Sequence, residues 1–351
     1  ETGATTATGL GASSGYFTLD RYNTISSTTG RFTMSQSTDA PIGFAKSMKV
    51  DCTTTDTSIG ANEYAIFTQP VEAHNIKGMA RGTSGAKEVT VSFYVKGTAA
   101  TYVCEMQDEA GRELSKTFNV TTAWERVELT FPADTNAAAA TTYDNTIGVD
   151  LYIWIQAGSN FSSGTIPTTW ADQSNANRCA GIGNFFSSTS NELYITGVQM
   201  EVGSVATDFE HRSYGEELAL CQRYFYNPNY NLNGARSDFN IDYLVSGGNN
   251  GWITWTVPFP VSMRVSSTFS HSLTNAKNTG SSAPANGADG WAFYIQNQGY
   301  VGVVGNGNIS NLGGGGKFHG IVGTYYCSPS STSCSHILIG NGCTFQFDAE
   351  L

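Results

Sequence analysis

Paired carboxylates are the first residues in this sequence that could perform chemistry. Asp108 and Glu109 are adjacent in the stretch DEAGRE, and Glu216 and Glu217 are adjacent further along the chain. Two carboxyl groups can hydrolyse a glycosidic bond when one is protonated and the other is ionised. The first pair, however, lies in a polar stretch with a glycine, which is typical of a solvated hairpin turn, and the second lies where the first turn of a helix favours carboxylates. Both pairs are therefore explained without catalysis.

Nucleophilic catalysis finds no better support in the sequence. The run from Gly11 to Gly15 matches G-x-S-x-G, but that motif needs a strand before it and a helix after it, and here a Thr/Ala-rich arm precedes a β-like run. The histidines show no i, i+4 pairing on a helix; they are His74, His211, His271, His319 and His336. We therefore expect no enzyme and no catalytic residues, and a polysaccharide-degrading enzyme remains the more distant alternative.

The cysteines leave one question open. Seven cysteines leave at least one thiol unpaired within a monomer. Cys327 and Cys334 bracket the stretch SPSSTS between two apolar runs, which favours a hairpin whose mouth could hold a disulfide; two separate thiols fit the same pattern. No two Cys-x-x-Cys units and no His-rich cluster occur, so we expect no structural zinc and no cofactor.

The aromatic residues suggest binding rather than catalysis. Sugar rings present apolar C–H faces that pack on Trp and Tyr, while their hydroxyls bond to amides and carboxylates. Trp170 is the first candidate because it lies in the loop-like tract GTIPTTWADQSNAN. Tyr152 and Trp154 are the next candidates, on the strand face opposite an aliphatic stripe. Tryptophans are often simply core residues, and this alternative stays open for all of them.

Composition narrows the class of protein. The chain has 351 residues, only 13% of them charged, with 39 Gly and a formal net charge of −11. No basic patch is present, so we expect no nucleic-acid partner, because Lys and Arg supply most of that affinity. No window approaches the roughly 20 apolar residues that cross a bilayer, so we expect no membrane insertion.

Strand patterns dominate the first two thirds of the chain. Apolar residues alternate with polar ones in 88–96, 126–131 and 149–156, the period of a half-buried strand. Many such runs, separated by turns and without long helices, predict an all-β protein with an N-terminal jelly-roll β-sandwich. We expect a linker or arm over 1–14, the jelly roll over 15–212, a connecting helix over 213–227 and a smaller antiparallel β-sandwich over 228–351.

The connecting helix carries an apolar set at helical spacing. Ser213 and Glu216 form a capping-box pattern before it, and its apolar residues are Tyr214, Leu218, Cys221 and Phe225. So short a helix is not stable alone. We therefore expect these four residues to bury a junction, either between domains or between subunits.

Several segments resemble a known family. Residues 197–226, GVQMEVGSVATDFEHRSYGEELALCQRYFY, resemble a segment common in virion structural proteins of marine tailed phages, which include tail fibres and capsid fibres. The pieces VTVSFYVKGT, TTAWERVELTFPADT and DLYIWIQAG are similar to the jelly-roll module, itself like carbohydrate-binding modules, that precedes this segment in the family. VPFPVSMRVSST and the terminal FDAEL resemble its second half, so the resemblance spans residues 60 to 351.

The resemblance implies a location and partners. It implies a non-enzymatic virion appendage, usually a homotrimer, that contacts other virion proteins and host surface polysaccharide. A purely architectural capsid-fibre or decoration protein is the alternative. It also leaves room for a structural calcium, with Glu201 in a suitable segment, and suggests that the chain is the distal part of a longer one.

Overall fold

The computed structural model divides the chain into two units. It describes residues 5–19, 21–226 and 260–264 with their side chains and, beyond residue 236, the backbones of further strands. The division falls between Arg212 and Ser213. The first unit therefore holds every strand from β1 to β13, and helix α2 belongs to the second unit.

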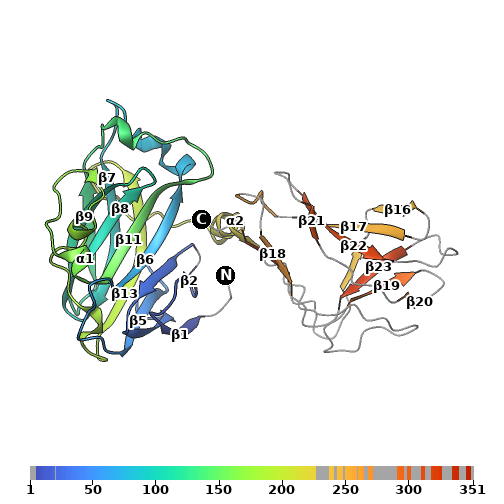
Figure 1. Ribbon diagram of the computed structural model, residues 1–351, viewed down its shortest axis with the longest axis horizontal. Helices are drawn as coiled ribbons and strands as arrows, with labels where there is room; N and C mark the ends of the chain where they lie inside the picture. Colours follow the sequence, from blue (N-terminus) through green and yellow to red (C-terminus); the bar gives the residue numbers. More distant parts are fainter. Residues whose placement is uncertain are drawn as a thin grey trace. The chain divides into compact units, whose positions relative to one another are not determined.

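The first unit is an antiparallel β-sandwich of the jelly-roll type (Figure 1). One sheet has six strands, in the order β1 (Thr6–Leu10), β4 (Arg31–Ser37), β5 (Ser47–Thr54), β13 (Glu192–Val202), β7 (Val89–Gly97) and β10 (Glu125–Phe131). The other has seven strands, in the order β12 (Ala171–Asp172), β9 (Arg112–Val120), β8 (Ala100–Asp108), β11 (Ile147–Ala157), β6 (Tyr64–Glu72), β3 (Asn23–Ser27) and β2 (Gly15–Tyr16). The predicted fold class is confirmed.

Short helices lie only in the connections of this unit. The α-helix α1 spans Ser159–Ser162, and the 3-10 turns are η1 (Ala73–Met79), η2 (Ala137–Ala139), η3 (Asn175–Asn177) and η4 (Phe185–Ser187). The prediction of a linker over residues 1–14 is wrong for Thr6–Leu10, because β1 pairs with β4 and thereby joins the sheet.

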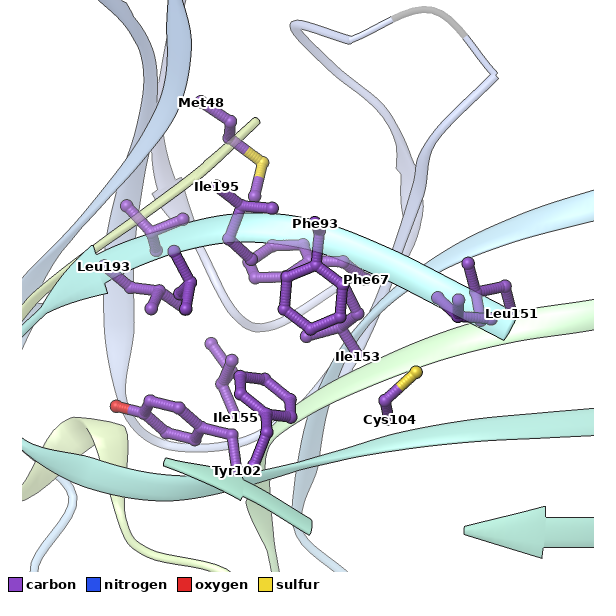
Figure 2. Packing of buried hydrophobic residues seen from close by; sticks show 14 of the residues in the cluster. Met48, Phe67, Phe93, Tyr102, Cys104, Leu151, Ile153, Ile155, Leu193 and Ile195 are labelled. Carbon is purple, nitrogen blue, oxygen red and sulfur yellow. The ribbon is translucent and has the colours of Figure 1, made fainter. Parts of the chain in front are cut away.

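The core lies between the two sheets and follows from the alternation in the sequence. Val91, Phe93 and Val95 of β7 are fully buried, and the inward residues of β11 face them from the other sheet. Figure 2 shows Phe93, Phe67, Ile153 and the residues around them in contact across this layer. Since successive side chains of a strand point to opposite faces, the apolar residues fill the core and their neighbours form the two outer faces.

The second unit also consists of antiparallel strands in the part that the structure describes. It begins with α2 (Tyr214–Gln222), and its pairings form one three-stranded and two four-stranded sheets. The strands are β14 (Phe225–Tyr226), β15 (Ser237–Asn240), β16 (Tyr243–Gly247), β17 (Asn250–Pro258), β18 (Thr268–His271), β19 (Trp291–Ile295), β20 (Gly299–Val301), β21 (Ser310–Leu312), β22 (Phe318–Tyr325), β23 (Cys334–Ile339) and β24 (Phe345–Asp348).

Helix α2 begins as predicted and ends early. Ser213 and Glu216 form the reciprocal capping box. The helix ends at Gln222 rather than at residue 227, because Phe225 and Tyr226 pair with β24 as a strand. Phe225 is therefore not on the helix, which corrects that prediction.

Candidate functional site

Polar and aromatic side chains gather on the outer face of the seven-stranded sheet, where β6, β11, β8 and β9 lie side by side. The strand register puts Tyr152 opposite Glu105, and Glu105 opposite Ser115. In the next row Asp150 lies opposite Gln107, and Gln107 opposite Glu113. Residues opposite each other on one face of a sheet are within contact distance. We call Glu105, Gln107, Glu113, Asp150, Tyr152 and Arg178 the outer-face cluster.

The adjoining apolar row of this face is covered. Trp154 lies there beside Val103 and Ile66, and residues of the segment that follows β11 pack on them, among them Phe161 and Cys179. Trp154 is consequently only 1% exposed, and its indole N–H donates to Glu105 Oε2 at 2.6 Å. The prediction that Trp154 contacts a ligand is wrong, because its ring is part of a satellite core.

Arg178 holds the cluster together from the segment that covers Trp154. Its Nε donates to Glu105 Oε1 at 2.9 Å and its Nη2 to Gln107 Oε1 at 3.2 Å. Its guanidinium also lies 4.7 Å from the ring centre of Trp154 and 5.5 Å from that of Tyr152. One cation thus fixes residues from β8 and β11, a rigid arrangement with few freely rotating groups.

Burial governs the protonation of the acids in the cluster. Glu105 is 0% exposed, and burial raises its pKa to about 7, although its ion pair with Arg178 and its hydrogen bonds pull in the other direction. Burial also raises the pKa of Glu113 and that of Asp150. All three acids therefore release their protons at a higher pH than the same side chains in an unfolded chain.

Three members of the cluster reach the surface. Gln107, Asp150 and Tyr152 are each half-buried, and the Tyr152 hydroxyl is a hydrogen-bond partner of Asp150. They offer an aromatic ring with an amide and a carboxyl together in the neighbouring row of the sheet. Such a combination can pack against the C–H face of a sugar ring and bond to its hydroxyls. Of the predicted binding residues, Tyr152 is the one the structure places in such a setting.

Trp170 lies elsewhere, over a buried network of charges that the sequence did not reveal. The Arg81 guanidinium stacks on its ring at 3.9 Å, and its indole N–H donates to the Pro132 carbonyl at 2.7 Å. Asp134 accepts from Arg81 at 3.2 Å and from Arg112 Nε at 2.8 Å. Trp170 is half-buried, so contacts within the protein cover part of its ring and the rest is exposed.

Asp108 joins the same network. It accepts from Arg81 at 2.7 Å and from the backbone N–H of Arg112 at 2.8 Å. The expectation of a solvated turn therefore holds for the exposed Glu109 and fails for Asp108, which is buried. The partners of Asp108 in this network include Arg81, which is 27 residues away in the chain, so local spacing gave no signal for its burial.

After β13, residues 203–210 of the segment that resembles phage virion proteins fold back on the outer face of the six-stranded sheet. Glu201 accepts from the backbone N–H of Thr207 at 2.9 Å and from its hydroxyl at 2.7 Å. Gln199 accepts from the backbone N–H of Glu210 at 2.9 Å, and Arg126 bonds the Thr207 carbonyl. These side chains hold residues 207–210, which lead to the second unit. The residue types at 199, 201 and 207 therefore have a structural explanation.

These hydrogen bonds explain the position of Glu201 without a calcium ion. Both of its oxygens are occupied by Thr207, and Gln199 donates to Oε1 as well at 3.0 Å. Within residues 5–19 and 21–226 and the other described residues, no group of three His, Cys, Asp or Glu side chains is placed to hold a metal.

The remaining predicted residues stay untested. On α2, Tyr214 is 81% exposed and Leu218 is 40% exposed, and the described residues show no cover over them. Cys327 and the side chain of Cys334 lie outside the described residues, and the buried Cys52, Cys104 and Cys179 are free thiols. In the described part of the chain, no helix is both long enough and apolar enough to cross a membrane.

Comparisons with known proteins concern the architecture. Neither protein-family models nor curated proteins match the sequence. Among solved structures, the family 11 carbohydrate-binding module of a cellulosomal cellulase of Clostridium thermocellum is similar at 11% identity and a TM-score of 0.29, covering 57% of this chain and 98% of the module. TmCBM61 in complex with β-1,4-galactotriose is similar at 9% identity and a TM-score of 0.27, covering 52% of this chain and 88% of TmCBM61.

Discoidin II from Dictyostelium discoideum is similar at 9% identity and a TM-score of 0.19, covering 84% of this chain and 78% of discoidin II. At these identities and TM-scores the likeness carries no information on ligands.

Proposed function

We propose that the first unit is a non-catalytic glycan-binding module whose binding surface is the exposed part of the outer-face cluster. The observation that carries this proposal is the position of Tyr152, a half-exposed ring on a central strand with Gln107 and Asp150 beside it. Aromatic rings with a few fixed polar groups are the usual means by which proteins hold sugars. Because Arg178 and the strand backbones fix these groups, little conformational entropy is lost on binding.

The same geometry favours binding over hydrolysis. Hydrolysis of a glycosidic bond needs two carboxyl groups that contact the substrate. Glu105 and Glu113 are neighbouring carboxyls of this face, and they are 0% and 2% exposed. A polysaccharide on the surface does not reach carboxyls buried to this degree, so we assign them to the support of Arg178 and Tyr152.

Replacing Tyr152 by alanine tests the binding surface. We expect the wild-type chain to bind members of a glycan array that includes laminarin, xylan and galactan, and the face at Tyr152 to bind them about tenfold more weakly or worse in Tyr152→Ala. Tyr214→Ala is the matched control, because Tyr214 is an exposed tyrosine of the second unit. Equal affinities of wild type and Tyr152→Ala, or no glycan bound by the wild type, would contradict the proposal.

Because residues 197–226 resemble a segment of phage virion proteins, we further propose that the chain is an appendage of a tailed-phage particle. In that setting it contacts polysaccharide on a host surface, and copies of itself are its nearest partners. Immunogold labelling of purified particles with an antibody against the chain tests this. Label at one fixed position on each particle is the expected result, and unlabelled particles would remove the virion assignment while leaving glycan binding untouched.

A further inference from the structure

A second group of aromatic side chains lies on the opposite sheet of the sandwich, where Trp124 is half-buried and Tyr194 is only 6% exposed. In the six-stranded sheet, Tyr194 of β13 lies opposite Lys49 of β5 on one side and opposite Lys96 of β7 on the other. Trp124 directly precedes β10, whose first residue, Glu125, lies opposite Val95, so Trp124 comes next to Lys96. Four side chains, Lys49, Tyr194, Lys96 and Trp124, thus form a row in which cations and aromatic rings alternate across the sheet. We call it the Trp124 row.

Contacts along the row fix the aromatic rings. The indole N–H of Trp124 donates to Asp39 Oδ1 at 2.9 Å, and its ring meets that of Tyr194 edge-on at 6.2 Å. Lys96 Nζ lies 5.9 Å from the ring centre of Trp124 and 5.1 Å from that of Tyr194, and it also bonds to Asp39 Oδ2. Trp124 is thereby held in one position before any ligand arrives, which lowers the entropic cost of binding.

Trp124 is nevertheless not a core residue. It is half-buried, and the side chain of Asp39 that anchors it is 42% exposed. An ionised carboxylate can accept about four hydrogen bonds, and Trp124 and Lys96 supply one each, so Asp39 retains acceptor capacity toward solvent. If Trp124 served only to attach the residues before β10 to Asp39, complete burial of its ring would stabilise the fold more.

Charges along the row indicate the kind of ligand. Lys96 is paired with Asp39, and Lys49 is paired with Asp51 at 2.8 Å and with Glu192 at 3.3 Å. Because acids already neutralise both lysines, an anionic ligand would have to displace Asp39, Asp51 or Glu192. An uncharged molecule with an apolar ring face and neighbouring hydroxyls meets both requirements, since the ring packs on Trp124 and the hydroxyls bond to Asp39 and Lys96.

We propose that the Trp124 row is a second carbohydrate-binding site, which takes an uncharged sugar unit on Trp124 with hydroxyls bonded to Asp39 and Lys96. It uses the sheet opposite to that of Tyr152 and does not depend on the outer-face cluster. With both sites occupied, one chain binds two sugar segments. A long polysaccharide that reaches both sites would then bind more tightly than either site alone allows.

The number of sugars bound per chain tests this proposal directly. The probes are laminarihexaose, xylohexaose and β-1,4-galactotriose, and equilibrium dialysis of the full chain measures their binding. We expect two molecules of the best probe per wild-type chain, one per chain for Trp124→Ala and for Tyr152→Ala, and none for the double variant. Trp124→Phe retains a ring but lacks the indole N–H, so we expect its site to bind with an intermediate affinity, about threefold to tenfold weaker than wild type.

The outcomes separate the two sites. If Trp124→Ala and wild type bind the same number of molecules with the same affinity, the Trp124 row is not a site, and the face at Tyr152 stands. If Trp124→Ala abolishes all binding while Tyr152→Ala changes nothing, the row is a site and the proposed function of the outer-face cluster fails. If Trp124→Ala does not fold, Asp39→Asn tests the row in its place: an unchanged affinity would overturn the proposal, and a loss of one bound sugar would support it.

Discussion

Asp134→Ala is expected to lower the free energy of unfolding by about 3–5 kcal/mol, the range for breaking a buried ion pair. Asp134 is 4% exposed and is the acceptor that Arg81 and Arg112 share. Its removal leaves Arg112, which is 5% exposed, with far fewer acceptors and without water to replace them. Burial already lowers the pKa of Arg81, partly offset by Asp108 and Asp134, so the site tolerates its charge only with these acids in place.

Denaturant unfolding measures this effect, and Asp172→Asn is the matched control. Asp172 also bonds to Arg112, at 2.9 Å, but its side chain is 90% exposed, so we expect a change of at most about 1 kcal/mol. An Asp134→Ala variant as stable as Asp172→Asn would show that the network contributes little to the fold.

The stability of the protein is expected to fall as the pH rises from about 4.5 to about 7, through the ionisation of Glu105. Burial is the largest cause of its raised pKa, with Arg178 acting in the opposite direction. An unfolded chain releases this proton near the ordinary pKa of about 4.5, and the folded chain keeps it until about 7. Between these values the folded state binds more protons, so each step in pH toward 7 favours unfolding, by a total on the order of 3 kcal/mol.

Glu105→Gln isolates this contribution. Glutamine has no proton to lose, so the curve of unfolding free energy against pH should flatten between about 4.5 and 7. Burial raises the pKa of the neighbouring Glu113 too, which leaves a smaller slope in the variant. The same slope in wild type and variant would contradict the assignment of this pH dependence to Glu105. The expected result matters for function, because Glu105 supports Arg178 and, through it, the face at Tyr152.

Local sequence patterns predicted the strands of the sandwich well. Residues 88–96, 126–131 and 149–156 are strands with nearly those bounds, and Val149, Leu151, Ile153 and Ile155 point into the core as expected. A period of two carries this information within a few residues. The capping box at Ser213 is equally local, and it too was predictable.

Features that depend on distant segments were not predictable. Tyr152 and Trp154 lie on the same face of one strand, and the pattern gave them the same setting. Only Trp154 is covered by the segment after β11, so its ring is part of a buried cluster, whereas the ring of Tyr152 reaches solvent. Likewise, Trp124 gains its place in the row from Asp39, which is 85 residues away in the chain. Contacts between residues so far apart in the chain depend on the topology of the fold, and the local spacing of residue types does not predict them.

A crystal structure of the full chain with the tightest-binding oligosaccharide of the array is the most direct test of the proposed glycan-binding face. We predict a sugar ring in contact with Tyr152, with its hydroxyls within hydrogen-bond distance of Gln107 or Asp150. A sugar bound elsewhere, with no ligand at Tyr152 under saturating conditions, would contradict the proposal that this face binds glycans.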